Sequence, residues 1–472
     1  MDGGAPSRVP APGPGSRDPS TTLLARATTV DPEVVAARST LDALQGDAAG
    51  AGLRNGRHLS GHAVGDDGIV AIPATARSGP PGGGANVGLV LTGGGARSAY
   101  QVGVLATIAR LLPRDAPSPF RTITGMSAGA IVAAAVACHA ARFREGVVAL
   151  ERVWRNFHTD QVFRADARSM LRAGLRWTLA LVSAGRLARP PQSVFDSSPL
   201  RRLLERHYDF GRMRAAMAAG HLDALAIAAS NYRTARSVAF FECRGPSSAQ
   251  DWDRGVRTQL GIDHLMASSA VPFLFPAVRV DDDYYGDGAM RQIAPLSPAI
   301  RLGAERLFMI GVRNASASDA IAATDRAPAP SIGQIVGFML DTLFIDSLQS
   351  ALAQLERINR LVEQSAVPTP DGLRRIDPLV VVPSADLSEI AARHARAMPR
   401  SVRTLLRTMG AANVAGAELL SYLLFESSYT RELIALGAAD ALARRAELEH
   451  FLRAAPAGAD ERPARADRVL AG

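Results

Sequence analysis

The chain has 472 residues, of which 47% are hydrophobic and 21% are charged, a balance typical of a protein that buries a core. This composition excludes a wholly disordered, collagen-like or coiled-coil chain. Two cysteines, Cys138 and Cys243, are too few for a disulfide framework or a cysteine-based zinc site, and an aromatic content of 5% leaves little material for stacking on single-stranded nucleic acid.

The net charge is +8, and all of the positive charge counted in it comes from arginine, because the sequence contains no lysine. A Walker A loop and a Schiff-base enzyme both need lysine, so both are excluded. The basic charge is explained either by a GC-rich genome or by attraction to anionic lipid or nucleic acid. Charge alone does not choose between these explanations.

The first 85 residues are rich in alanine, glycine, proline and arginine, and they end in the glycine–proline run 79–84. We predict a disordered arm over residues 1–85. No signal peptide is predicted, because Met1 is not followed by an apolar segment, and no transmembrane helix is predicted, because no stretch of roughly 18 apolar residues occurs. We expect a cytoplasmic protein, soluble or peripheral on the inner face of the membrane.

Regular structure is predicted from Val87 onward. The apolar run 87–91 predicts a buried parallel strand, residues 92–95 a tight turn, and residues 99–112 a helix. A second strand, 120–124, leads into a helix of small residues, 130–141. Later strands are predicted at 222–229, 237–243, 273–280 and 306–312. Strands that alternate with helices predict an α/β fold with a mainly parallel sheet.

The C-terminal third reads as chiefly helical. Residues 332–363 have a helical apolar period, and 419–452 repeat it with a break at Gly437. A short apolar run, 379–382, predicts one last strand. The chain is thus divided into the arm, an α/β region over 87–304, a mainly helical extension over 305–455 and a flexible tail over 456–472.

The clearest chemical motif is Gly125-Met126-Ser127-Ala128-Gly129, which fits G-x-S-x-G between a predicted strand and a predicted helix. Small flanking residues permit a sharp turn that projects the Ser127 hydroxyl outward at the positive end of the helix. The motif predicts a nucleophile elbow.

A second glycine-rich turn is Gly93-Gly94-Gly95-Ala96-Arg97. Consecutive glycines let several backbone N–H groups point at one phosphate or one oxyanion. A dinucleotide site needs glycine where Ser98 stands and an acidic residue after the next strand, whereas Asp115 precedes that strand. Together with the elbow, the turn predicts an oxyanion hole.

A serine nucleophile needs a base, and the sequence offers two. None of the histidines that follow Ser127 has a clear signature, and His264, the least implausible of them, would make a conventional Ser-His-Asp esterase. Asp287 lies between Gly286 and Gly288, which let a carboxylate approach another backbone closely. A third hypothesis is a non-enzymatic module that binds membrane or nucleic acid through its arginines, but it leaves these motifs unexplained.

The glycine turn, the Ser127 elbow and Asp287-Gly288-Ala289, in this order, resemble the patatin-like phospholipases. Residues 266–276 and 195–200 resemble further segments of that family, and Ser98 departs from its usual last glycine. The resemblance covers about 87–304 and implies that this region is the catalytic domain. It implies a three-layer α/β fold with a mainly parallel central sheet flanked by helices, followed by the helical C-terminal extension.

The resemblance also implies an activity: a lipid acyl hydrolase of phospholipase A or lysophospholipase type, with Ser127 as nucleophile and Asp287 as general base, and without metal or other cofactor. The amides around Gly94, Gly95 and Ala96, in the turn 93–97, would form the oxyanion hole, and Arg97 would steady this loop or contact a head-group phosphate. The implied partners are a phospholipid or other acyl lipid and a membrane surface, not nucleic acid. Acyl transfer on the same fold stays an alternative, and the oligomeric state is not predicted.

Overall fold

The fold is built around a central β-sheet. The computed structural model describes residues 86–164, 193–245, 252–291, 294–313, 331–364 (without the side chains of 343–347), 373–408, 410 and 417–453. The predicted arm and tail lie outside these residues. Among the described residues, nine strands form the sheet: β1 (Val87–Leu91), β2 (Thr122–Met126), β3 (Ala224–Asn231), β4 (Ser237–Cys243), β5 (Gly255–Arg257), β6 (Val278–Val280), β7 (Asp283–Asp287), β8 (Arg306–Ile310) and β9 (Asp377–Val381).

The strand order is β5-β4-β3-β2-β1-β8-β9, and the hairpin β6–β7 joins through β7 to β3. The five central strands from β3 to β9 run parallel, whereas β4 and β7 pair antiparallel with β3. β1, β2, β3 and β8 are buried along their whole length, as expected for strands with helices on both faces. The predicted α/β fold with a mainly parallel sheet is confirmed.

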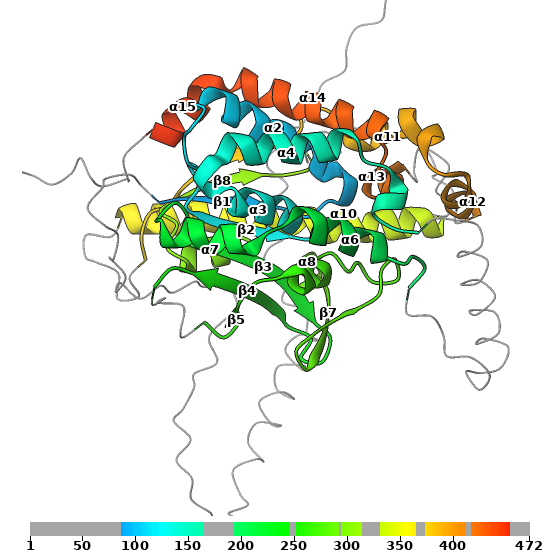
Figure 1. Cartoon of the computed structure of the whole chain (residues 1–472), viewed down its shortest axis with the longest axis horizontal. Helices are drawn as coiled ribbons and strands as arrows, with labels where there is room; N and C mark the ends of the chain where they lie inside the picture. The colour runs from blue at the N-terminus through cyan, green and yellow to red at the C-terminus, as the bar shows by residue number, and fades with distance from the viewer. Residues whose placement is uncertain are drawn as a thin grey trace, which may run out of the picture. The chain divides into compact units, whose positions relative to one another are not determined.

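Helices and short 3-10 turns connect and cover these strands. They are η2 (Gly95–Ser98), α2 (Ala99–Leu111), α3 (Ala128–Cys138), η3 (Ala140–Arg142), α4 (Phe143–Arg155), η4 (Thr159–Gln161), α6 (Ser198–His207), α7 (Phe210–Ala218), α8 (Ile262–Ser268), η6 (Gly288–Arg291), α9 (Ser297–Arg301), α10 (Ile332–Gln364), α11 (Leu387–His394), η9 (Ala395–Ala397), α12 (Arg400–Thr408), α13 (Ala417–Leu423), α14 (Ser427–Ala443) and α15 (Arg445–Arg453). In Figure 1, α14 is outermost on one side of the sheet, with α2 and α4 beneath it. None of the described helices has the length and apolar composition needed to cross a membrane.

The C-terminal helices differ from the prediction. The expected helix over 419–452 is three helices, and Gly437 does not break it but lies inside α14. A Cβ on Gly437 would stand 2.2 Å from the Tyr100 carbonyl oxygen of α2, and one on Gly103 would stand 2.1 Å from the Ile434 carbonyl oxygen. The two glycines therefore let α2 and α14 pack at close range, so the predicted break was wrong.

Two further expectations are modified. Of the strand predicted over 273–280, only Val278–Val280 forms a strand, β6. β8 and β9 lie beyond residue 304 yet pair within the central sheet, next to β1. The predicted catalytic domain and the predicted extension therefore share one sheet.

Candidate active site

Strand β3 brings the predicted nucleophile and the predicted base together. β2 pairs with β3 as far as Met126, which lies beside Ala228, and β7 pairs with β3 starting from Asp287, which lies beside Ala229. Ala229 also pairs with a residue of β4, so β7 must occupy the opposite edge of β3, the edge that β2 uses. The two strands thus meet end to end. Because Ser127 follows Met126, its side chain is placed near Asp287.

The turn at Ser127 is strained and specific. Ser127 has φ 54° and ψ −134°, a region that residues other than glycine seldom adopt. It precedes α3, but its side chain makes no capping hydrogen bond, and its N–H donates to Ser268 Oγ at 2.9 Å. A Cβ on Gly129 would lie 2.4 Å from the Thr92 carbonyl oxygen, and one on Gly125 would lie 2.6 Å from that of Gly129. The glycines of the motif therefore permit a tight turn in which the Ser127 hydroxyl does not cap α3.

Asp287 is held firmly at the end of β7. It is 2% exposed, its N–H donates to the Ala270 carbonyl at 2.9 Å, and its own carbonyl accepts from Ser230 Oγ at 2.8 Å. Oδ1 of its carboxylate accepts the Ala289 N–H at 2.9 Å. Oδ2 is buried and has no well-aligned hydrogen bond to a described residue. One carboxylate oxygen is therefore fixed and the other is unsatisfied.

Burial raises the pKa of Asp287 to about 7, although the nearby Ser127 side chain and the Ala289 N–H both lower it. Burial acts this way because it penalises the charged form of a carboxyl group. A carboxyl group with a pKa near neutrality is a far better proton acceptor than an ordinary aspartate. The site therefore combines a strained serine with a nearby carboxylate of raised basicity.

The glycine turn lies on the other side of Ser127. It forms η2, whose first N–H groups have no acceptor within the helix. Gly95 has φ +54° and lines the same cavity as Ser127, and a Cβ on it would lie 2.3 Å from the Tyr422 carbonyl oxygen. Gly93, Gly94 and Ala96 are buried behind it. This arrangement suits donation of backbone N–H groups to an oxyanion.

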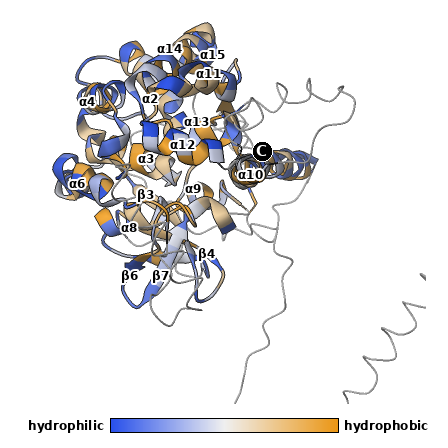
Figure 2. Ribbon diagram, turned by 90° about the vertical axis from the view of Figure 1, so that its right-hand side faces the viewer, coloured by the Kyte–Doolittle hydropathy of each residue, from blue (hydrophilic) through white to orange (hydrophobic). Residues whose placement is uncertain are grey.

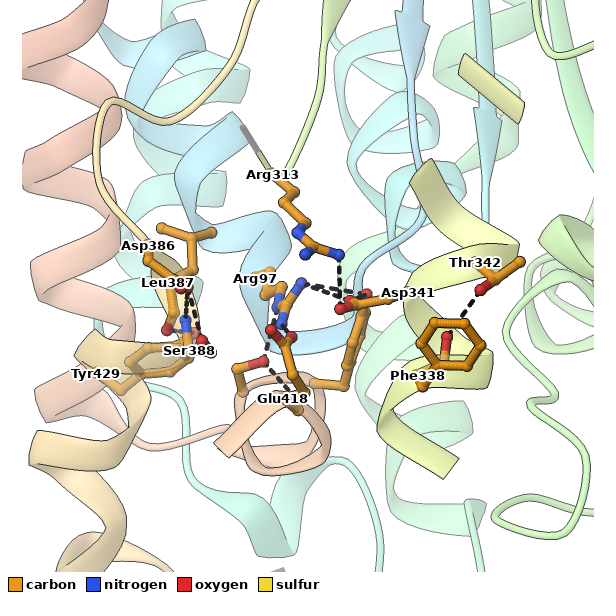
Figure 3. Close-up of polar contacts among 12 residues, drawn as sticks. Arg97, Arg313, Phe338, Asp341, Thr342, Asp386, Leu387, Ser388, Glu418 and Tyr429 are labelled. Carbon is orange, nitrogen blue, oxygen red and sulfur yellow. Dashed lines mark hydrogen bonds and ion pairs between the residues drawn. The ribbon is translucent and has the colours of Figure 1, made fainter. Parts of the chain in front are cut away.

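Arg97, the last residue of the turn, is 1% exposed and lies in a cluster of polar groups from α10 and α13 (Figure 3). Its guanidinium forms ion pairs with Asp341, at 3.1 Å, and with Glu418. It donates to Ser421 Oγ at 2.7 Å and stacks on the Tyr422 ring at 4.1 Å. Burial lowers the pKa of Arg97, but the Tyr422 oxygen and the two carboxylates raise it overall.

The cluster extends to a second arginine, because Asp341 also accepts from Arg313 Nη1 at 2.7 Å (Figure 3). Each carboxylate oxygen of Asp341 thus meets a different arginine. Arg97 ties the glycine turn to two C-terminal helices and does not reach the surface. This burial favours the role of steadying the loop over contact with a head-group phosphate.

A cavity of about 440 Å³ opens from Ser127 and Gly95. Its wall is mostly apolar and includes Ile131, Leu150, Trp154, Leu204, Phe275 and Phe425. Ser127 and His139, at opposite ends of α3, both line it, so it extends along the helix for about 18 Å at 1.5 Å per residue. Charged residues of the segment 205–212 line it as well. An apolar space of this size and shape fits a hydrocarbon chain.

The histidines are placed unfavourably for a triad. His264 is buried in α8, where its Nδ1 accepts the Gly261 N–H at 3.1 Å and its ring packs 4.8 Å from that of Phe240. Burial lowers the pKa of His264, and the residue does not line the cavity. His139 lies at the far end of α3 from Ser127. The geometry therefore favours Asp287 over His264 as the base.

Several site residues carried no sequence signal of their own. Ser268, which holds the Ser127 N–H, falls within the family-like segment 266–276, but no role was predicted for it. Ser269 lines the cavity, and its buried hydroxyl has no hydrogen-bond partner among the described residues. Asp341 and Glu418 lie far along the chain on separate helices, so only the fold reveals that they meet Arg97.

Comparisons with known proteins agree with the motifs. Residues 89–300 match the sequence model of the patatin-like phospholipase family. No curated protein sequence matches the chain.

Among solved structures, the chain is similar to human GIVD cytosolic phospholipase A2 in complex with methyl γ-linolenyl fluorophosphonate, at 13% identity over 78% of this chain and 58% of that one, with a TM-score of 0.38. VipD from Legionella pneumophila matches at 13% identity over 74% and 67% of the two chains, with a TM-score of 0.28. The ExoU–SpcU complex of the Pseudomonas aeruginosa type III secretion system matches at 13% identity over 85% and 86%, with a TM-score of 0.22. The chain thus spans less than two thirds of the human phospholipase structure.

Proposed function

Because residues 89–300 of the chain belong to the patatin-like phospholipase family, we propose that it is a lipid acyl hydrolase with a Ser127–Asp287 dyad. The observation that carries the proposal is the meeting of these two residues, on one edge of β3, at an end of the apolar cavity. An ester bond at Ser127 would have room for its acyl chain beside α3.

The dyad would act in two steps. Ser127 Oγ attacks the ester carbonyl while the Asp287 carboxylate takes its proton, and the alcohol leaves with that proton as the acyl-serine ester forms. Water then gives a proton to Asp287 and attacks the acyl-serine, and the fatty acid leaves as Ser127 Oγ regains the proton. A base with a pKa near 7 suits both halves of this exchange at neutral pH.

The negative charge that develops on the carbonyl oxygen needs donors. The backbone N–H groups around Gly94 and Gly95 are the candidates, because η2 begins there and Gly95 lines the cavity beside Ser127. The N-terminus of α3, directly after Ser127, adds its partial positive charge. Arg97 supports this turn from behind through its ion pairs with Asp341 and Glu418.

The test is fatty-acid release from vesicles of mixed phospholipid and lysophospholipid with EDTA present. We expect wild-type protein to release fatty acid, Ser127→Ala and Asp287→Asn to lose at least about a hundredfold in rate, and His264→Ala to keep most of the activity. Comparing the lipids identifies the ester that is cleaved.

Two results would count against the proposal. Loss of activity in His264→Ala with retention in Asp287→Asn would replace the dyad with a triad. Folded wild-type protein that releases no fatty acid, but moves the acyl group to an added alcohol, would make the enzyme an acyltransferase.

A further inference from the structure

The outward face of α10 changes character along the helix. In its first two turns the exposed residues are apolar: Ile332, Ile335, Phe338 and Met339, with Phe338 72% exposed. In its second half, the exposed positions are mainly polar or charged, including Gln349, Glu356, Arg357 and Arg360. A helix on the surface of a globular protein normally turns polar residues outward. The first two turns of α10 therefore present an apolar surface that packing within the described core does not explain.

This apolar surface lies beside the catalytic end of the cavity. The next residue after Met339, Leu340, lines the cavity, and Asp341 binds Arg97 of the glycine turn. η6, which directly follows Asp287, also contacts α10. Figure 3 shows Asp341 turned toward Arg97, with Phe338 on a different face of the same helix. α10 thus joins the site on one face and presents the apolar residues on another.

Helix α12 adds positive charge next to this surface. Ser331, at the start of α10, donates to the Gly410 carbonyl at 3.1 Å, just beyond the end of α12. In Figure 1, α12 lies next to the N-terminal end of α10. Figure 2, which faces the right-hand side of that view, shows the two helices beside each other. α12 buries Val402 and Leu406 and exposes Arg400 and Arg407, and it contains no carboxylate.

We propose that the first two turns of α10, together with α12, form a docking surface for an anionic lipid bilayer. Exposed large apolar side chains flanked by arginine are the combination that inserts into the boundary between head groups and acyl chains. The proposal rests in part on the proposed function, since an acyl-lipid substrate lies in such a bilayer. A second copy of the chain fits less well, because pairing this surface with itself would bring the arginines of two α12 helices together.

The apolar part is tested by sedimentation with vesicles of phosphatidylcholine, with or without phosphatidylserine, using Ser127→Ala protein so that no lipid is consumed. We expect Phe338→Glu/Met339→Glu to lower the vesicle partition coefficient about tenfold or more. The matched control is Leu361→Glu, at an exposed apolar position on the far end of α10, 57% exposed, which should bind as the parent does. The milder pair Phe338→Ala/Met339→Ala should weaken binding in the same direction.

The charged part is tested by Arg400→Gln/Arg407→Gln. We expect about tenfold weaker binding to vesicles that contain phosphatidylserine and no change on phosphatidylcholine alone. Arg445→Gln/Arg453→Gln removes the same charge from α15, where both side chains are exposed, and should have little effect. Equal losses in the two arginine pairs would mean that only net charge matters, and would overturn the assignment to α12.

Docking and catalysis are separated with a soluble short-chain ester, p-nitrophenyl butyrate. With Ser127 retained, the α10 and α12 variants should hydrolyse this ester like wild-type protein, while losing activity on vesicles. Vesicle binding without any ester hydrolysis would leave docking intact and refute the proposed function. Unchanged vesicle binding in Phe338→Glu/Met339→Glu would refute the docking surface, and a shift from dimer to monomer in that variant would assign the surface to a second copy.

Discussion

At the scale of single residues, the burial of Asp287 affects both its basicity and the stability of the fold. Burial gives its carboxyl group a pKa of about 7, and the unprotonated form is the one that can act as a base. We therefore predict that kcat/KM for the soluble ester rises with pH through about 7 and falls by about tenfold per pH unit well below it. A pH–rate profile that is flat between pH 5 and pH 8 would contradict this role.

The same burial has a cost in stability that depends on pH. The pKa of Asp287 is raised from 3.8 to about 7 in the folded chain, so between these values the folded chain holds the proton that the unfolded chain has lost. The free energy of unfolding consequently falls as pH rises across this window. Asp287→Asn should be more stable than wild type at pH 8, by up to about 4 kcal/mol, with the advantage shrinking toward pH 4.

Urea unfolding at several pH values measures this difference. Asp282→Asn is the matched control, because it makes the same substitution at a carboxylate whose side chain is fully exposed. An Asp287→Asn variant that is less stable than wild type at pH 8 would show that the carboxylate is well accommodated when charged.

Arg97 gives a second residue-scale prediction. Arg97→Ala leaves the carboxylates of Asp341 and Glu418 without their shared partner, and removing one side of a buried ion pair costs about 3–5 kcal/mol. The exposed pair Arg142–Glu145, at 3.4 Å, should cost below about 1 kcal/mol when Arg142 is replaced by alanine. Urea unfolding of both variants checks the contrast, and equal losses would contradict it.

Much of the site could be predicted from the sequence at this scale, because the residues that carry the proposed chemistry lie in short motifs. Ser127 and Asp287 each have glycines nearby that the turn or the close approach to another strand requires, and the structure shows those contacts. Asp341 and Glu418 could not be predicted, since an acidic residue on a helix has no local feature that indicates a buried arginine opposite it.

At the scale of elements, α3 forms one wall of the cavity. Ser127, Ile131, Ala135 and His139 line it at intervals of four residues, so one face of the helix forms a wall from Ser127 outward. Ala135 lies about 12 Å along the axis from Ser127. We predict that Ala135→Phe blocks the cavity there, and that the variant cleaves short acyl esters normally but loses about tenfold or more on long-chain esters.

A series of p-nitrophenyl esters of increasing chain length checks this prediction. Val148→Phe is the control, because Val148 is an exposed position on α4 that does not line the cavity, and its chain-length profile should match wild type. An unchanged profile in Ala135→Phe would mean that the acyl chain lies elsewhere.

The strands and helices could be predicted where their buried residues form a regular local pattern in the sequence. The strands at 87–91 and 237–243 and the long helix from 332 have strong local patterns, and the structure has them nearly as predicted. Gly437 was misinterpreted because a glycine that permits close packing of two helices looks, in sequence, the same as one that ends a helix. Its partner on α2 lies more than three hundred residues away.

At the scale of the whole molecule, the family-like segment 87–304 does not complete its own sheet, and extending it to residue 313 adds only β8. β9 pairs with β8, and α14 packs along α2, although both β9 and α14 lie beyond residue 313. We predict that residues 86–313 alone aggregate or unfold without cooperativity, because the buried face of α2 would be exposed. Residues 86–453 should unfold cooperatively in urea. A soluble, cooperatively folded 86–313 segment would show that the C-terminal helices are an independent addition.

The edge of β3 has a consequence for how such an enzyme changes over time. The spacing of the proposed nucleophile and the proposed base depends on two neighbouring alanines in β3, not on the chain that joins Ser127 to Asp287. That intervening chain includes α4 and α6, which form part of the cavity wall. Insertions, deletions and exchanges there can reshape the substrate range while the reacting groups stay in register. Under the proposed function, lipid preference would therefore change independently of the geometry of Ser127 and Asp287.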